Sequence, residues 1–132
     1  EPATLEERTA WFERLRNQGH PVLVLEEDGR VVGFASYGPF RDKAAYLHTV
    51  EHSVYVAEGS RSNGAGRMLL GALLDHAQGC GVHVMIGVLD ADNAASRAFH
   101  KSLGFVESAV LSEVGRKFGR WLDVVFVTHH FD

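Results

Sequence analysis

A glycine-bearing loop between a β-rich run and a leucine-rich helical run constrains the fold of this 132-residue chain more than any other segment. The loop, at 61–66, reads Arg-Ser-Asn-Gly-Ala-Gly. Its glycines allow the backbone to turn so that several N–H groups converge on one point. The helix that follows adds unpaired donors and the positive end of its dipole, and Arg61 and Arg67 add charge. The segment predicts an anion site suited to a pyrophosphate. A glycine-rich turn without a ligand is the alternative, and the loop alone does not decide between them.

Two other nucleotide-binding motifs do not fit this loop. No Gly-Lys-Ser/Thr is present, as a P-loop requires, and Leu69 stands where a dinucleotide fingerprint has its third glycine. The loop is therefore neither a P-loop nor a dinucleotide-binding fingerprint.

Hydrophobic periodicity and turn residues predict the rest of the fold. A capping box at Thr4-Leu5-Glu6-Glu7 opens the first helix, Asp28-Gly29 is a hairpin signal, and Gly38-Pro39 ends the second strand. The predicted elements, in chain order, are a helix over 4–18, strands over 22–27, 30–37 and 47–56, a helix after Gly66, a strand over 82–89, a helix over 93–103, and strands over 105–114 and 121–131. This order predicts one domain over 1–132 of the α/β class (mixed α+β), with a mixed central sheet and helices on both faces.

Composition limits the partners and the compartment. A net charge of -4 argues against nucleic acid as the main partner, which would favour a basic face. Cys80 is the single cysteine, so no internal disulfide can form and a reducing compartment is expected. No apolar run reaches the roughly 18 residues of a membrane span. We therefore expect a cytoplasmic protein that binds neither nucleic acid nor membranes.

Two motifs at the expected distance resemble one family. Arg61-x-x-Gly64-x-Gly66 after a strand resembles the CoA-pyrophosphate signature of the Gcn5-related N-acetyltransferase superfamily, and the run from Asn93 to Phe105 resembles its Asn…Tyr…Gly-Phe segment. The segments at 49–56, 82–86 and 113–123 resemble the phosphinothricin and methionine sulfoximine N-acetyltransferases in particular. The resemblance covers nearly the whole chain.

The resemblance implies an acetyl-CoA N-acyltransferase fold and an enzyme that uses acetyl-CoA as co-substrate. It would transfer acetyl to the amine of a small amino-acid-like substrate, of the phosphinothricin or methionine sulfoximine/sulfone type. In the family, backbone N–H groups of the third strand bind CoA and polarise the carbonyl, and the Asn holds the pantetheine arm. The cofactor-binding residues implied here are Val54, Tyr55, Val56, Arg61, Ser62, Asn63, Gly64, Ala65, Gly66, Arg67 and Asn93.

The chain departs from the family pattern in two ways. Family members usually begin with a further strand and helix, so we interpret this chain as lacking both. His100 occupies the position where most of the superfamily has tyrosine, although the phosphinothricin subgroup resembles this chain in having histidine there.

Acetyl transfer needs a base for the ammonium and a proton for the departing thiolate. Glu51 is the predicted base, and its alternative is an exposed strand carboxylate. His100 is the predicted acid, and its alternative is a surface helix histidine. Strand alternation places Glu51, Ser53 and Tyr55 on one face and His52 on the other, unless a bulge interrupts the strand.

The acceptor site is predicted around the polar loop before the third strand. Its positive charges can pair with an anionic group of the substrate by charge-assisted hydrogen bonds, whereas a solvated charge run is the alternative. The predicted substrate-binding residues are Arg41, Asp42, Lys43, Tyr46, Glu51, His52 and Ser53.

Two other functions and a metal site are alternatives to this prediction. A protein or peptide N-acetyltransferase, or a CoA-binding module without turnover, fits the same cofactor motifs. The run His48-Thr49-Val50-Glu51-His52 matches an inverted zinc-protease pattern, but in a strand about 13 Å separates the two histidines, too far for one zinc ion. We therefore predict no metal, and we expect a homodimer.

Overall fold

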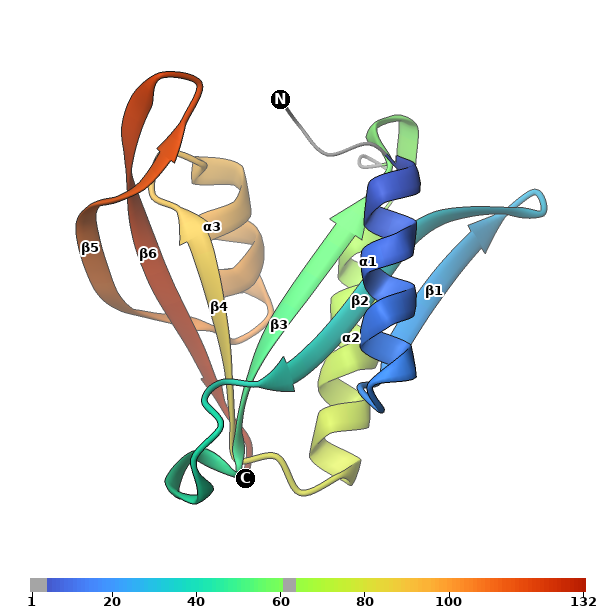
Figure 1. The fold of residues 1–132 in the computed structure, drawn as a ribbon, viewed down its shortest axis with the longest axis horizontal. Helices are drawn as coiled ribbons and strands as arrows, with labels where there is room; N and C mark the ends of the chain where they lie inside the picture. Colours follow the sequence, from blue (N-terminus) through green and yellow to red (C-terminus); the bar gives the residue numbers. More distant parts are fainter. Residues whose placement is uncertain (1–4, 61–63) are drawn as a thin grey trace.

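The computed structural model describes residues 5–60 and 64–132, whose strands form one mixed sheet (Figure 1). Across the sheet the strand order is β1-β2-β3-β4-β6-β5. Strands β3 and β4 pair in parallel, and the other neighbouring strands pair antiparallel. The strands are β1 (Val22–Glu27), β2 (Arg30–Pro39), β3 (Thr49–Val56), β4 (Val84–Asp90), β5 (Val106–Lys117) and β6 (Arg120–His130).

Helices cover both faces of this sheet. Figure 1 shows α1 (Leu5–Asn17) in front of the sheet and both α2 (Ala65–Gly79) and α3 (Ala94–Ser102) behind it. Two 3-10 turns, η1 (Ala44–Tyr46) and η2 (Glu58–Ser60), lie in the loops before and after β3. The predicted fold class, a mixed central sheet with helices on both faces, is confirmed. The predicted capping residue of α1, Thr4, lies outside the described residues.

Apolar side chains at helical spacing fix how the helices pack. In α1, Phe12 is buried and its ring stacks on Phe34 of β2, with centroids 4.8 Å apart. In α2, the residues that face the sheet recur at helical spacing and are fully or almost fully buried: Leu69, Leu70, Leu73 and Ala77. Together with Met85, Val125 and Val127 they form the core between the sheet and α2.

Gly33 brings α2 into close contact with β2 and β3. A Cβ atom at this position would lie 2.6 Å from Cδ1 of Leu69 and 3.0 Å from the backbone oxygen of Tyr55. A larger residue would therefore displace the Leu69 side chain and press against the backbone of β3. The glycine keeps the first turns of α2 against the end of β3, where the candidate site lies.

The second strand is longer than the sequence predicted. Gly38 and Pro39 do not end the strand, because they pair with Glu51 and Val50 of β3. Proline lacks an N–H donor and is tolerated here at the terminal position of the strand. The third strand begins at Thr49 rather than at 47, because residues 44–46 form the turn η1.

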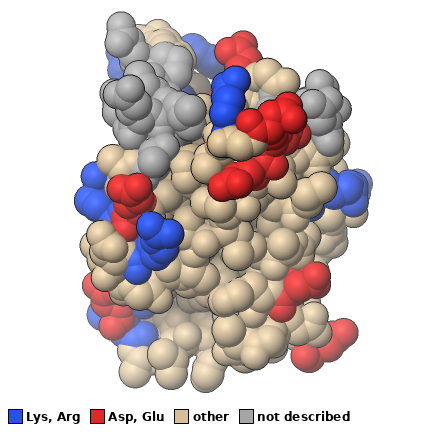
Figure 2. Space-filling model, turned by 90° about the vertical axis from the view of Figure 1, so that its right-hand side faces the viewer, with Lys and Arg blue, Asp and Glu red and all other residues tan. Residues whose placement is uncertain are grey.

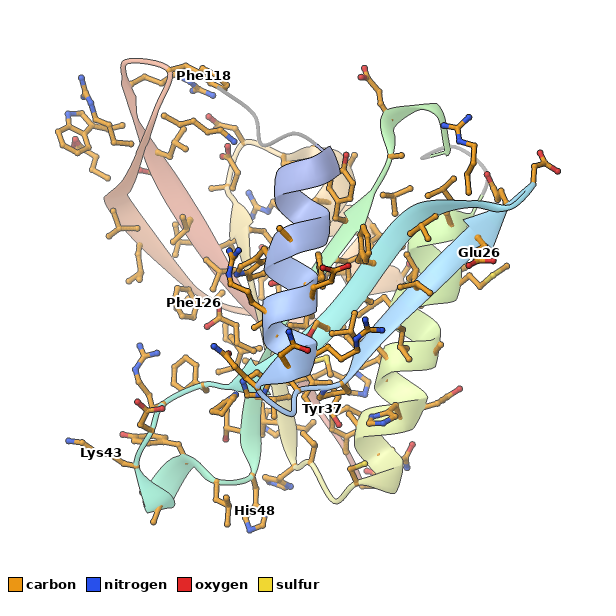
Figure 3. All side chains as sticks on the ribbon, turned by 45° about the vertical axis from the view of Figure 1, so that its right-hand side comes forward. Glu26, Tyr37, Lys43, His48, Phe118 and Phe126 are labelled. Atoms are coloured by element: carbon orange, nitrogen blue, oxygen red, sulfur yellow. The ribbon has the colours of Figure 1, made fainter. Side chains whose placement is uncertain are left out.

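The last hairpin also extends further than predicted. Strands β5 and β6 continue to Lys117 and Arg120 and are joined by Phe118 and Gly119, whose φ values are 52° and 75°. Two positive φ angles in a two-residue loop define a type I′ hairpin turn. The hairpin therefore projects beyond the neighbouring strands, and Phe118 lies at its tip (Figure 3). None of the helices that the structure describes is long and apolar enough to cross a membrane.

Candidate active site

The parallel strands β3 and β4 separate part-way along the sheet. Their pairing covers Thr49–Glu51 of β3 and Val84–Ile86 of β4. Farther along, β3 continues to pair with β2 and β4 continues to pair with β6, so the two strands diverge toward their carboxyl ends (Figure 1). The carboxyl ends of parallel strands are the usual place for a ligand in such sheets.

A cleft of about 710 Å³ lies where the strands diverge, between β3, the first turn of α2 and α3. The residues that line it come from these three elements: Val54, Tyr55, Val56, Gly64, Gly66, Arg67, Asn93, Ala95, Ser96, Phe99 and His100. The cleft is therefore built by the segments that carry the two predicted cofactor motifs.

Most of the described residues that were predicted to bind the cofactor line this cleft. Ala65 is the exception, because its side chain is buried in the core and it can offer the cleft its backbone alone. Arg61, Ser62 and Asn63 lie outside the described residues. Sequence reasoning missed Ala95, Ser96 and Phe99, although all three lie within the Asn93–Phe105 segment that carries the second motif. The signal that could have identified them is their spacing along the predicted helix, which places them on one side of α3.

The N-terminus of α2 gives the cleft an anion-binding character. Gly64 is the N-cap residue, with a φ of 76° that favours glycine, and it exposes no side chain. The N–H groups of residues 65–67 have no acceptor within the helix, because the first intrahelical bond runs from Met68 N–H to the Gly64 carbonyl. These donors and the helix dipole favour a phosphate group at this end of the cleft.

Arg67 ties the two helices of the cleft together. Its Nη2 donates to Oγ of Ser102 at 2.7 Å, and the Ser102 hydroxyl donates to the carbonyl of Phe99 at 2.7 Å. The guanidinium thus lies across the cleft from α2 to α3, and its exposed part adds positive charge near the N-terminus of α2.

Asn93 caps the helix α3. Its Oδ1 accepts a hydrogen bond from the Ser96 N–H at 3.0 Å, which satisfies one donor of the first turn. Oδ1 of Asn93 is therefore already used within α3. The amide nitrogen is the group that Asn93 can offer to a pantetheine arm in the cleft.

A pair of buried histidines lies beneath the cleft. Nε2 of His52 on β3 is 3.1 Å from Nε2 of His100 on α3, and the side chains are 7% and 5% exposed. Nδ1 of His100 donates to the Ser96 carbonyl at 2.8 Å. Phe105 packs edge-on against both rings. His100 is therefore not a surface histidine, and the contact between the two rings joins β3 to α3.

Burial keeps both rings neutral at neutral pH. It lowers the pKa of His52 to about 3, and the neighbouring His100 adds to the lowering. Burial also lowers the pKa of His100, against the opposing effect of the hydrogen bond to Ser96. The structure thus shows a neutral pair.

Glu51 lies on the face of β3 opposite to His52. Glu51 is exposed and His52 is buried, and the pairing of β3 with β2 continues without a register shift from Val50 to Val56. The predicted alternation of the strand is confirmed, and no bulge brings the two side chains to one face.

A second cavity, of about 410 Å³, lies at the other end of β3. Four of the residues predicted to bind the acceptor line it: Arg41, Asp42, Lys43 and Tyr46. Figure 3 shows Lys43 on the loop that runs from β2 to β3. Val50 of β3 also lines this cavity, whereas Glu51, His52 and Ser53 line neither the cavity nor the cleft.

Arg41 lines the second cavity and is held by contacts with Phe40. Its Nη1 donates to the Phe40 carbonyl at 2.7 Å, and its guanidinium lies 4.0 Å from the centre of the Phe40 ring. These contacts orient the side chain without neutralising its charge, so an anionic group can still bind it.

Tyr37 is a polar residue of the second cavity that sequence reasoning missed. Its hydroxyl lies 2.9 Å from Nδ1 of His76 on α2. Burial raises the pKa of Tyr37 to about 12, and Cys80 contributes to the increase, so the hydroxyl stays protonated at neutral pH. Within residues 5–60 and 64–132, no group of three His, Cys, Asp or Glu side chains is placed to hold a metal ion.

Comparison with known proteins gives these cavities a context. The model of the acetyltransferase (GNAT) family matches residues 1–105. The chain is 50% identical over 125 residues to the L-amino acid N-acyltransferase MnaT of Escherichia coli, covering 95% of this chain and 73% of that protein. It is 48% identical over 125 residues to the L-methionine sulfoximine/L-methionine sulfone acetyltransferase of Salmonella typhimurium, again covering 95% and 73%.

Solved structures agree with this relationship. The structure of yncA from Salmonella typhimurium with its cofactor acetyl-CoA has a TM-score of 0.89 and 45% identity, covering 100% of this chain and 76% of that chain. The ribosomal-protein-alanine N-acetyltransferase from Brucella melitensis has a TM-score of 0.88 and 49% identity, covering 98% and 80%. The chain described here therefore belongs to the GNAT family of acetyltransferases.

Proposed function

We propose that this enzyme transfers the acetyl group of acetyl-CoA to the amine of a small amino-acid-like acceptor, of the methionine sulfoximine, methionine sulfone or phosphinothricin type. The main supporting observation is the arrangement of the two cavities along β3. Val50 lines the second cavity, Val54 and Tyr55 line the cleft, and Glu51, on the same face of β3 as Tyr55, lies between the two cavities along the strand. The names of the relatives at 48–50% identity support an amino-acid acceptor.

The cleft suits acetyl-CoA as the acetyl donor. The N-terminus of α2, with Gly64, Gly66 and Arg67, provides donors and charge for a pyrophosphate. Asn93 lies on the path that a pantetheine arm would follow toward β3. At the strand, residues 54–56 line the cleft, and their backbone N–H groups are proposed to bind the arm and to polarise the thioester carbonyl.

Glu51 is the proposed general base. An α-ammonium has no lone pair for attack, so it must first lose a proton, directly or through a water. The neutral nitrogen then forms a bond to the acetyl carbon, and the carbon–sulfur bond breaks. The sulfur leaves as a thiolate that needs a proton, and His100, which lines the cleft, is the proposed donor. Neutral His100 first takes up a proton from water at Nε2, and the contact of Nε2 with His52 opens so that this proton reaches the sulfur. Glu51 gains the proton of the amine and releases it to water, and His100 returns to its neutral form, so atoms and charge balance.

The second cavity is proposed to hold the anionic end of the acceptor. Arg41 and Lys43 carry positive charge there, and Tyr46 adds a hydroxyl. A guanidinium binds a carboxylate or a phosphinate through charge-assisted hydrogen bonds with defined geometry. An acceptor with its anionic end here and its amine toward Glu51 would be oriented for transfer.

A protein or peptide acceptor is the second candidate. The similarity to the Brucella melitensis protein named as a ribosomal-protein-alanine N-acetyltransferase favours it. The positive charges of Arg41 and Lys43 in the second cavity favour the small acceptor instead, because they suit the anionic end of an amino acid.

An acceptor panel separates these functions. The rate of thiol release from acetyl-CoA is measured with methionine sulfoximine, methionine sulfone, phosphinothricin, the common amino acids, and alanine-initiated peptides. We expect the sulfoximine, the sulfone or the phosphinothricin to be preferred over every peptide. Faster turnover of the peptides would contradict the small-acceptor proposal, and CoA binding without turnover of any acceptor would favour a non-catalytic module.

We also propose that the enzyme forms a homodimer through the hairpin β5–β6. This hairpin is at the edge of the sheet and exposes large apolar side chains: Val106, Val110, Leu111, Val114, Phe118 and Trp121. Exposed apolar clusters of this kind commonly mark protein interfaces. By contrast, the face in Figure 2 carries charged side chains spread among uncharged ones. Light scattering of the wild type should give a dimer mass, and Trp121→Glu should give a monomer. A monomeric wild type would contradict the proposal.

A further inference from the structure

The hydrogen bonds of the histidine pair determine which ring donates and which ring accepts. Nδ1 of His100 faces the Ser96 carbonyl at 2.8 Å, and a carbonyl only accepts, so this nitrogen carries the proton of the neutral ring. Nε2 of His100 is then an acceptor. Its neighbour at 3.1 Å, Nε2 of His52, must therefore donate. The proton of neutral His52 is thus on Nε2, and its Nδ1 is a bare acceptor.

The other tautomer of neutral His52 carries its proton on Nδ1, and no acceptor among the described residues would stabilise it. Nδ1 of His52 is buried, and among the described residues it has no hydrogen-bond partner. A proton on Nδ1 would therefore be a buried donor without an acceptor, and it would also leave two bare nitrogens, Nε2 of His52 and Nε2 of His100, facing each other. The surroundings thus favour donation from His52 to His100.

Gly87 of β4 provides the space for the His52 ring. A Cβ atom at this position would lie 2.8 Å from Nε2 of His52, 3.1 Å from its Cε1 and 3.0 Å from Cγ2 of Val127. Gly87 follows Ile86, the last residue of β4 that pairs with β3. The ring therefore occupies the point at which the strands separate, directly against the backbone of β4.

We propose that His52 is a positioning residue: it donates a hydrogen bond from Nε2 to Nε2 of His100 and so fixes the orientation and the protonation state of that ring beneath the cleft. The inference rests on the proposed function for the role of His100 toward the sulfur. It assigns His52 a task different from the acceptor binding expected from the sequence, since the ring lines neither cavity.

The hydrogen bond affects how readily His100 takes up a proton. It uses the lone pair of the neutral ring, so it stabilises the neutral form and holds the pKa of His100 below that of a free imidazole, in the same direction as burial. The other titratable groups that face the pair are Tyr37, which is the cross-strand neighbour of His52 and is bonded to His76, and His129, which packs on Phe105. No carboxylate of the described residues forms a hydrogen bond or ion pair with either ring.

The substitutions His52→Phe and His52→Gln separate positioning from packing. Phenylalanine keeps a ring beside Phe105 and Gly87 but removes the donor. Glutamine places an amide N–H close to the position of Nε2 and keeps the donor. The full-length protein is labelled with ¹⁵N at histidine, the His100 signals are assigned with His100→Gln, and the tautomer and the titration of His100 are followed by NMR. The kcat for the preferred acceptor is measured as a function of pH.

The wild type should show His100 as the neutral Nδ1–H tautomer with an Nε2 signal shifted by hydrogen bonding. In His52→Phe, the Nε2 signal of His100 should lose that shift and the pKa of His100 should rise. The kcat of this variant should change by about tenfold, and its pH profile should be displaced. His52→Gln should restore the wild-type behaviour. Unchanged His100 signals in a folded His52→Phe variant would overturn the inference, as would altered signals with an unchanged kcat and pH profile. If no acceptor turns over, the proposed function fails and the NMR result alone decides on the hydrogen bond. If His52→Phe does not fold, an Nε2–H tautomer of His100 in the wild type would overturn the inference.

Discussion

Val50 and Val54 lie on the same face of β3 and line different cavities, Val50 the cationic cavity beside Arg41 and Val54 the cleft beside the N-terminus of α2. Four residues of a strand span about 13 Å, so the two cavities open at separate points along β3. The residues between them, 51–53, include the exposed carboxylate of Glu51 and the buried ring of His52. In the proposed function, β3 is the element that brings the donor and the acceptor together.

The phosphate end of the cleft can be tested with two glycines of the same helix. A Cβ at Gly66 would lie 3.4 Å from Phe99, which is ordinary contact, so Gly66→Ala should fold but place a methyl group in the cleft. We expect the Kd for CoA to rise by roughly tenfold, about 1.4 kcal/mol. Gly71 has no atom within 4 Å of its Cβ position, so Gly71→Ala is the matched control and should leave the Kd unchanged. Isothermal titration calorimetry measures both, and equal affinities for the two variants would contradict the cleft assignment.

The charge of Arg41 should be needed for the acceptor but not for the donor. Removing a charge-assisted hydrogen bond costs about 1.5–3 kcal/mol, so Arg41→Ala should lower kcat/KM for the acceptor by roughly tenfold or more. The Kd for CoA should not change, because Arg41 does not line the cleft. Arg30→Ala, at the opposite end of β2, is the control. An unchanged acceptor KM in Arg41→Ala would contradict a role of Arg41 in acceptor binding and would indicate a solvated surface charge.

The buried histidines should make the fold less stable in acid. The pKa of His52 is about 3 in the fold, against 6.5 when exposed, so the unfolded chain binds more protons between these values. Stability is therefore complete above pH 6.5 and is lost as the pH falls, by about 2 kcal/mol at pH 5 from His52 alone. His100 acts in the same direction.

Urea unfolding of the wild type and of His52→Phe at pH 8 and pH 5 measures this contribution. The variant has no titratable group at 52, so its free energy of unfolding should fall by about 2 kcal/mol less than that of the wild type between the two pH values. Equal losses in both proteins would show that His52 is not held neutral by burial.

The parts of the site that sequence predicted are those encoded by local patterns. The loop before α2 and the run after Asn93 each place several cleft residues within one short segment, so the two motifs, through the family resemblance that they carry together, indicated the site. Alternation along β3 likewise predicted that Glu51 and His52 face opposite ways, since the strand pairs with β2 without a register shift.

The histidine pair depends on contacts that no local pattern encodes. His52 and His100 are 48 residues apart and meet because α3 packs behind β3, and Gly87 provides the space from a third segment. The extension of the β5–β6 hairpin to Lys117 and Arg120 was missed for a different reason. The charged residues Arg116 and Lys117 are more typical of a loop than of a strand. The signal for the turn lies in the single dipeptide Phe118-Gly119.

The role of Glu51 as the base that deprotonates the acceptor is the central claim, and a pH–rate profile tests it most directly. Glu51→Gln keeps the shape of the side chain and removes the base, and Glu26→Gln on the edge strand β1 (Figure 3) is the control. With saturating acetyl-CoA and one saturating acceptor, kcat of Glu51→Gln should fall by about 10²–10⁴ at neutral pH and recover in part at high pH, where the amine deprotonates in solution. The Kd for acetyl-CoA should be that of the wild type. Profiles of wild type and Glu51→Gln that overlay across the pH range would contradict the account.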